Sequence, residues 1–124
     1  MYKLSFLSSG TGNLTETILR SIEKGVLKNI IPVSIISDKD SASLKLASTF
    51  NLTTHIVDFN ASISREQSSD KVLAILREQK IDFSFMTFDR ILSGAIIKEY
   101  KNRIINLHPS LLPAFPGYNT IAKA

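Results

Sequence analysis

The chain of 124 residues contains no cysteine and only two histidines. The absence of cysteine excludes a disulfide framework and thiolate chemistry. No apolar run approaches the roughly 20 residues that a membrane-spanning helix needs, and residues 1–9 lack the long apolar segment of a secretory signal peptide. We therefore expect a protein that does not interact with membranes and that resides in the cytoplasm.

The chain also lacks a strong charge of either sign. Fifteen Lys and Arg residues oppose eleven Asp and Glu residues, which gives a net charge of +4. No run of basic residues and no interleaved aromatic residues indicate a nucleic-acid partner. The balance suits a small anionic substrate, although solvated lysines are the commoner explanation of such a charge. We expect small-molecule substrates.

What the sequence does contain is a regular alternation of strand-like and helix-like segments. The expected strands are residues 2–7, 31–37, 53–58, 81–86 and 104–107. The expected helices are residues 13–24, with Asn13 as N-cap, 41–50, 65–80 and 93–100. This order predicts βαβ crossovers and an α/β fold, an open, mostly parallel sheet with helices on both faces. A single domain is expected over residues 1–124. Its last residues, 119–124, begin a helical pattern that ends before two turns, so we expect a truncated C-terminus.

Ligands of open parallel sheets bind outside the carboxyl ends of the strands. Three segments with candidate polar groups follow expected strands, namely residues 8–13, 87–92 and 106–117. In the first, Gly10 and Gly12 form a Gly-x-Gly turn before a helix, where backbone amides attract an anion such as phosphate. The motif is short, and a tight turn that binds nothing is the alternative.

The second segment carries Asp89 and Arg90 directly after an apolar strand. A surface ion pair or a helix cap would explain these two residues without any ligand. Their place at a strand end nevertheless makes them candidates for the same site.

The third segment carries Asn106 and His108, two residues apart, whose side chains we expect to emerge on the same side where the strand ends. Three of the four prolines follow and stiffen the loop. An imidazole that exchanges a proton and a carboxamide that donates to an oxyanion suit acyl transfer through a tetrahedral intermediate. His55, by contrast, lies mid-strand and is interpreted as structural. No metal-ligand spacing and no Ser-His-Asp set is present, so neither a metal nor a covalent serine enzyme is expected.

These segments resemble one known family over the whole chain. NLHPSLLPAFPG (residues 106–117) closely resembles the signature of the phosphoribosylglycinamide formyltransferase family, the folate-dependent enzymes of purine synthesis. SSGTGNL (residues 8–14) resembles the phosphate-binding turn of that family, and FDRILS (residues 88–93) resembles its folate loop. Residues 64–66 also resemble a family feature. The resemblance implies a Rossmann-like formyltransferase fold, represented by its N-terminal part.

The resemblance also implies roles for single residues. The phosphate of the substrate would be held by Thr11, Gly12 and Asn13. The folate co-substrate would be met by Arg65, Asp89, Arg90, Ile91, Leu92 and Asn106. Asn106 would hydrogen-bond the formyl oxygen, and His108 would act as the general acid–base group.

The implied reaction is transfer of a formyl group from 10-formyltetrahydrofolate to the amine of phosphoribosylglycinamide, without an acyl-enzyme and without a metal. Two alternatives stay open. The family turn usually has one residue more between its second glycine and its asparagine, and the family's essential aspartate would fall beyond Ala124. A non-catalytic truncated remnant or binding module is therefore one alternative. Formyltetrahydrofolate hydrolase, which shares the Asn/His pair, is the other. An exposed sheet edge would allow a homodimer.

Overall fold

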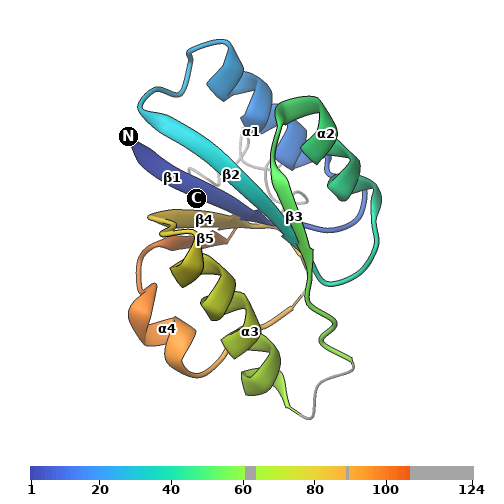
Figure 1. Cartoon of the computed structure of the whole chain (residues 1–124), viewed down its shortest axis with the longest axis vertical. Coiled ribbons are helices and arrows are strands. Elements are labelled where there is room, and N and C mark those ends of the chain that lie inside the picture. The colour runs from blue at the N-terminus through green and yellow to red at the C-terminus, as the bar shows by residue number, and fades with distance from the viewer. Residues whose placement is uncertain (61–63, 89, 107–124) are drawn as a thin grey trace, which may run out of the picture.

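The computed structural model describes residues 1–60, 64–88 and 90–106, in which strands and helices alternate along the chain (Figure 1). The strands are β1 (Tyr2–Leu7), β2 (Ile30–Ser37), β3 (Thr53–Ile56), β4 (Phe83–Met86) and β5 (Ile104–Asn106). The helices are α1 (Asn13–Glu23), the 3₁₀ turn η1 (Ala42–Lys45) that continues into α2 (Leu46–Phe50), α3 (Arg65–Glu78) and α4 (Ala95–Glu99). None of the described helices combines the length and apolar character that crossing a membrane requires.

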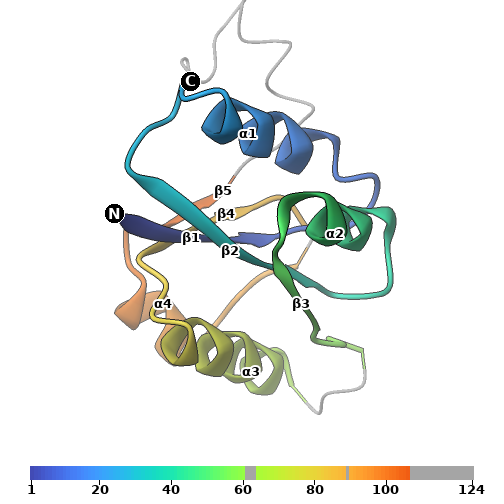
Figure 2. The ribbon, with the colours of Figure 1, turned by 45° about the horizontal axis from the view of Figure 1, so that its top comes forward.

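The described strands form one sheet in the order β3-β2-β1-β4-β5, and every neighbouring pair is parallel. Helices α1 and α2 cover one face of the sheet, and α3 and α4 cover the other (Figure 2). The prediction of an open parallel sheet with helices on both faces is confirmed. From β1 the chain builds outward to β2 and β3 on one side and to β4 and β5 on the other. The carboxyl ends of β1 and β4 thus form the switch point at which open α/β sheets bind ligands.

Each face of the sheet has its own apolar core. Phe6 of β1 packs in the core that contains Leu19 of α1, whereas its neighbour Leu7 packs in the core that contains Leu76 of α3. Successive side chains of a strand point to opposite faces, so two adjacent apolar residues serve two cores. This burial on both faces explains why the strand sequences are almost continuously apolar.

The expected boundaries differ from the structure mainly at the short helices. The expected helix over residues 41–50 begins as the 3₁₀ turn η1, and the expected helix over residues 93–100 is helical only at Ala95–Glu99. A helix of five residues has too few internal hydrogen bonds to be stable alone. Its position must therefore come from packing against the rest of the domain.

Helix α4 is held against α3 and the sheet by an apolar and a polar contact. The Ile96 side chain is fully buried, and the Tyr100 hydroxyl donates to the carbonyl oxygen of Ile81 at 2.7 Å. Burial raises the pKa of Tyr100, so its phenol remains protonated as that donor. On the surface, Arg77 Nε donates to Glu99 Oε2 at 2.9 Å, and this bond lowers the pKa of Glu99.

The packing of α4 predicts unequal effects for two adjacent isoleucines. Ile96→Ala should lower the free energy of unfolding by about 2–5 kcal/mol, because it leaves a cavity under the helix. Ile97, which is 52% exposed, is the matched control, and its alanine variant should lose less than about 1 kcal/mol. Urea unfolding followed by circular dichroism measures both. Equal losses would contradict this account of the helix.

Candidate active site

The turn after β1 requires glycine at position 12, both because the backbone there is left-handed and because a side chain would have no room. Gly10 and Gly12 have φ angles of +74° and +76°, in the left-handed region. A Cβ on Gly12 would lie 2.9 Å from the Cα of Ser43, whereas one on Gly10 would meet nothing within 4 Å. The prediction that Asn13 caps α1 is wrong. Gly12 is the N-cap, because its left-handed backbone starts the helix and makes Asn13 the first helical residue.

Two hydrogen bonds, one between buried hydroxyl groups and one between backbone groups, fix the back of this turn. Thr15 Oγ1 donates to Ser8 Oγ at 2.8 Å, and the Ser43 amide donates to the carbonyl oxygen of Gly10 at 3.1 Å. The front of the turn is open. All three residues predicted to bind the phosphate line a hollow of about 150 Å³, together with Thr87 from the end of β4: Thr11, Gly12 and Asn13. Helix α1 begins at this hollow, and the free backbone amides of its first turn favour the binding of an anion there.

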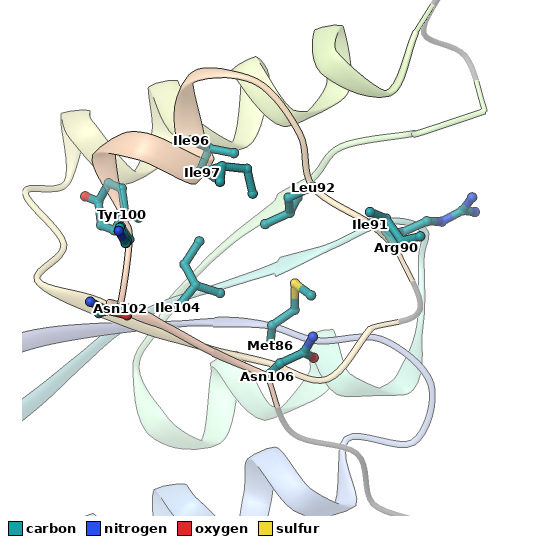
Figure 3. Close-up of a pocket in the computed structure, with 11 residues that line it drawn as sticks. Met86, Arg90, Ile91, Leu92, Ile96, Ile97, Tyr100, Asn102, Ile104 and Asn106 are labelled. Atoms are coloured by element: carbon teal, nitrogen blue, oxygen red, sulfur yellow. The ribbon is translucent and has the colours of Figure 1, made fainter.

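A larger, mainly apolar pocket of about 380 Å³ lies between β4, β5 and α4 (Figure 3). Its interior is formed by Met86, Leu92 and Ile104, whose side chains converge in Figure 3. Asn106, at the end of β5, lies beside Met86 at the edge of the pocket. Four of the residues expected to meet folate line this one pocket: Arg90, Ile91, Leu92 and Asn106.

The guanidinium group of Arg90 does not enter the pocket. In Figure 3 it extends away from Met86 and Ile104. Arg90 Nε donates to Asp38 Oδ2 at 2.7 Å, and the guanidinium lies 5.7 Å from the centre of the Phe59 ring. The partner of Arg90 is thus a residue more than fifty positions earlier in the chain.

Asp38 is the residue of this site that sequence reasoning missed. It follows β2 directly, and its side chain is only 6% exposed. A carboxylate immediately after a buried strand, at the ligand-binding edge of a parallel sheet, was the available signal. The pairing itself could not be found, because it joins two loops that only the folded sheet brings together.

Arg65 lies in a separate hollow beside the pocket. It is the first residue of α3, whose N-cap Ser64 accepts a hydrogen bond from the Gln67 amide at 3.1 Å. Phe59, Arg65, Arg90 and Ile91 line this hollow of about 240 Å³. The structure therefore brings the two predicted folate-binding arginines to the same place.

Two predicted site residues, Asp89 and His108, lie outside the described residues. His55 is half-buried on β3, and its Nε2 lies 3.2 Å from Nε2 of Gln79 at the end of α3, which fits a structural role. Among residues 1–60, 64–88 and 90–106, no cluster of three or more His, Cys, Asp or Glu side chains could hold a metal ion.

The arrangement as a whole offers two adjoining binding places. Met86 lines the apolar pocket, and the next residue, Thr87, lines the hollow at the β1 turn. An anion at the turn and a largely apolar ring system in the pocket would thus lie close together. The carboxamide of Asn106 stands at the edge of the pocket, where it can donate to an oxygen of a bound ligand.

Comparison with known proteins identifies the family of this chain. A sequence profile of the family described as formyl transferase matches residues 2–124. Phosphoribosylglycinamide formyltransferase of Escherichia coli is 29% identical over 95% of this chain, which covers 56% of that protein. A trifunctional purine biosynthetic protein of Gallus gallus is 31% identical over 94% of this chain, which covers 12% of that protein.

The fold is shared as well. The crystal structure of phosphoribosylglycinamide formyltransferase from Bacillus halodurans is 30% identical and superimposes with a TM-score of 0.81, over 98% of this chain and 63% of that one. The chain thus spans a little over half the length of these single-function relatives. The match along almost the entire chain, together with the shared fold, shows that the chain belongs to the formyl transferase family.

Proposed function

We propose that this chain takes part in transfer of the formyl group from 10-formyltetrahydrofolate to the amine of phosphoribosylglycinamide, in de novo purine synthesis. One observation carries the proposal. The residues that the family resemblance assigns to folate, Arg90, Ile91, Leu92 and Asn106, line a single apolar pocket. That pocket adjoins the hollow lined by the residues assigned to the substrate phosphate.

The folate would occupy the apolar pocket and the neighbouring hollow. A volume of about 380 Å³ lies in the range of small-molecule sites, which are mostly apolar with a few polar groups. The pterin ring would contact Ile91 and Leu92. The hollow that Arg65 lines would receive the carboxylate end of the co-substrate. The phosphate of phosphoribosylglycinamide would bind at the backbone amides near Gly12 and Asn13.

The chemistry needs one oxyanion donor and one proton carrier. The substrate amine attacks the formyl carbon, and the formyl oxygen gains negative charge that the Asn106 carboxamide would stabilise by donating a hydrogen bond. The intermediate collapses when the bond from the formyl carbon to N10 of the folate breaks. The proton lost by the amine passes to N10, and His108 is assigned this transfer by the sequence resemblance, since an imidazole titrates near neutral pH. The sequence resemblance implies no metal for this reaction.

The expected cytoplasmic location and the homodimer remain predictions. For the homodimer, the structure contributes one relevant feature. Within the described residues β5 is an edge strand, and the side chain of Ile105 on it is 41% exposed.

The proposal predicts formyl transfer by the purified chain and its loss on removing the oxyanion donor. Asn106→Ala should lower kcat about 10²- to 10³-fold, and His108→Ala should also remove most turnover. Lys71→Ala, an exposed change on α3, is the control and should leave turnover unchanged. The assay follows product formation from 10-formyltetrahydrofolate and phosphoribosylglycinamide.

The same assay separates the alternatives. Formate release that does not depend on the amine acceptor would favour formyltetrahydrofolate hydrolase. A folded wild-type chain that shows no turnover would remove the claim that it is an enzyme by itself and would favour a binding module or remnant. Full activity of Asn106→Ala would contradict the proposed mechanism.

The phosphate site predicts a difference between the two glycines of the turn. Gly12→Ala should raise KM for phosphoribosylglycinamide about tenfold or more, because its Cβ would meet the backbone of Ser43 and displace the amides. Gly10→Ala introduces only the backbone strain, since its Cβ faces open space. Its effect on KM should be several-fold smaller. Steady-state kinetics with each substrate varied in turn measures both variants. Equal effects of the two variants on KM would show that phosphate binding does not depend on the exact position of the backbone amides near Gly12.

A further inference from the structure

We propose that Asp38 is a positioning residue that acts through Arg90 to hold residues 90–92 against the apolar pocket. The proposal deepens the proposed function and rests on it, because residues 90–92 are the segment assigned to folate. It assigns to Asp38 a task that the sequence motifs did not indicate, and it gives the Arg90 side chain a structural partner in place of a ligand.

The carboxylate of Asp38 depends on Arg90. Its side chain is 6% exposed, and Oδ2 accepts from Arg90 Nε at 2.7 Å. The second oxygen, Oδ1, is buried and has no hydrogen-bond partner within the described part of the chain. A buried carboxylate is tolerated when a positive charge compensates it. The guanidinium of Arg90 supplies that charge.

The Arg90 side chain is engaged by the protein on several sides. Besides Asp38, its guanidinium lies over the ring of Phe59 at 5.7 Å, and Nη1 lies 3.5 Å from Oδ1 of Asn60. Phe59 and Asn60 belong to the connection after β3. In Figure 3 the guanidinium extends away from the interior of the pocket. The side chain therefore ties its segment to the loops after β2 and β3, while the segment itself lines the pocket.

The segment needs such a tie because it is neither helix nor strand. On one side, the Phe88 amide donates to the carbonyl oxygen of Leu7 at 3.2 Å, and on the other the Ser93 amide donates to Ser69 Oγ at 2.9 Å. The bond from Arg90 to Asp38 lies between these two anchors. Since β2 and β4 flank β1 in the sheet, the pair connects their loops across the carboxyl end of the central strand.

The segment presents two side chains of different burial to the pocket. Leu92 is 8% exposed, whereas Ile91 is 66% exposed. Buried Leu92 forms part of the core, so it resists displacement. Exposed Ile91 has little packing of its own, and its position at the pocket depends on its neighbour Arg90. Loss of the Asp38 carboxylate should therefore be felt first at Ile91.

The experiment is a double-mutant cycle read by methyl NMR in the unliganded chain. Asp38→Asn and Arg90→Met should each shift the methyl resonances of Ile91, and to a smaller extent those of Leu92. In its Ile91 resonances the double variant should resemble Arg90→Met alone, because without the Arg90 guanidinium Asp38 has no link to residues 90–92. Asp40→Asn makes the same chemical change at an exposed position in the same loop and should shift neither residue. Unchanged Ile91 resonances in Asp38→Asn, or additive shifts in the double variant, would overturn the proposal.

Thermal unfolding distinguishes loss of the pair between Asp38 and Arg90 from a general destabilisation of the variants. Arg90→Met leaves a buried carboxylate without its counter-charge, so this variant should melt lowest. Adding Asp38→Asn to it should raise the melting temperature, which a pair of independent residues would not do. A double variant that melts below both single variants would overturn the pairing on which the proposal depends.

Ligand affinity connects the pair to the proposed function. Asp38→Asn should raise the dissociation constant for tetrahydrofolate, and KM for 10-formyltetrahydrofolate, about tenfold, with KM for phosphoribosylglycinamide unchanged. An equal rise in both KM values would overturn the assignment to the folate side. If the wild-type chain neither binds tetrahydrofolate nor transfers formyl groups, the proposed function fails. The methyl and melting measurements still decide whether Asp38 positions residues 90–92.

Discussion

The structure depends on one strand that is enclosed on every side. β1 has hydrogen-bonded neighbours along both edges, and the side chains of its residues 4–7 are buried, the apolar ones in the cores on both faces of the sheet. The buried polar side chain of β1 is hydrogen-bonded as well, since Ser5 Oγ lies 2.6 Å from Ser84 Oγ of β4. A strand so enclosed cannot slip by one residue without exchanging its two cores. Its carboxyl end is therefore a fixed point of the domain.

The parallel arrangement then places the described loops that carry candidate chemistry at that fixed end. The chain enters each strand at the same edge of the sheet and leaves it at the other, so the segments after β1, β2 and β4 meet there. The turn with Gly12, the carboxylate of Asp38 and the guanidinium of Arg90 come from distant parts of the sequence. What distinguishes them from ordinary loop residues is this shared edge.

The parts that sequence could predict are those that local patterns determine. Burial on both faces leaves apolar strands, so the sheet and its helix layers follow from the order of the segments. The turn at Gly12 follows from a short motif. The cap at Asn13 was predicted wrongly, because the competition between a side-chain cap and a left-handed glycine is settled by backbone geometry. Asp38 was missed because a carboxylate directly after a strand is a weak signal by itself. It indicates a site only when its partner, Arg90 from the loop after β4, is known.

The pair between Asp38 and Arg90 also changes how charge is distributed at the site. Arg65 and Arg90 both line the hollow beside the pocket, yet the guanidinium of Arg90 is already compensated by a buried carboxylate. An anion entering the hollow would therefore find its net positive charge at exposed Arg65. Since exposed charges attract weakly through water and salt, recognition there would depend on hydrogen-bond geometry more than on long-range attraction. The net charge of +4 consequently says little about this site, and the placement of one carboxylate says more.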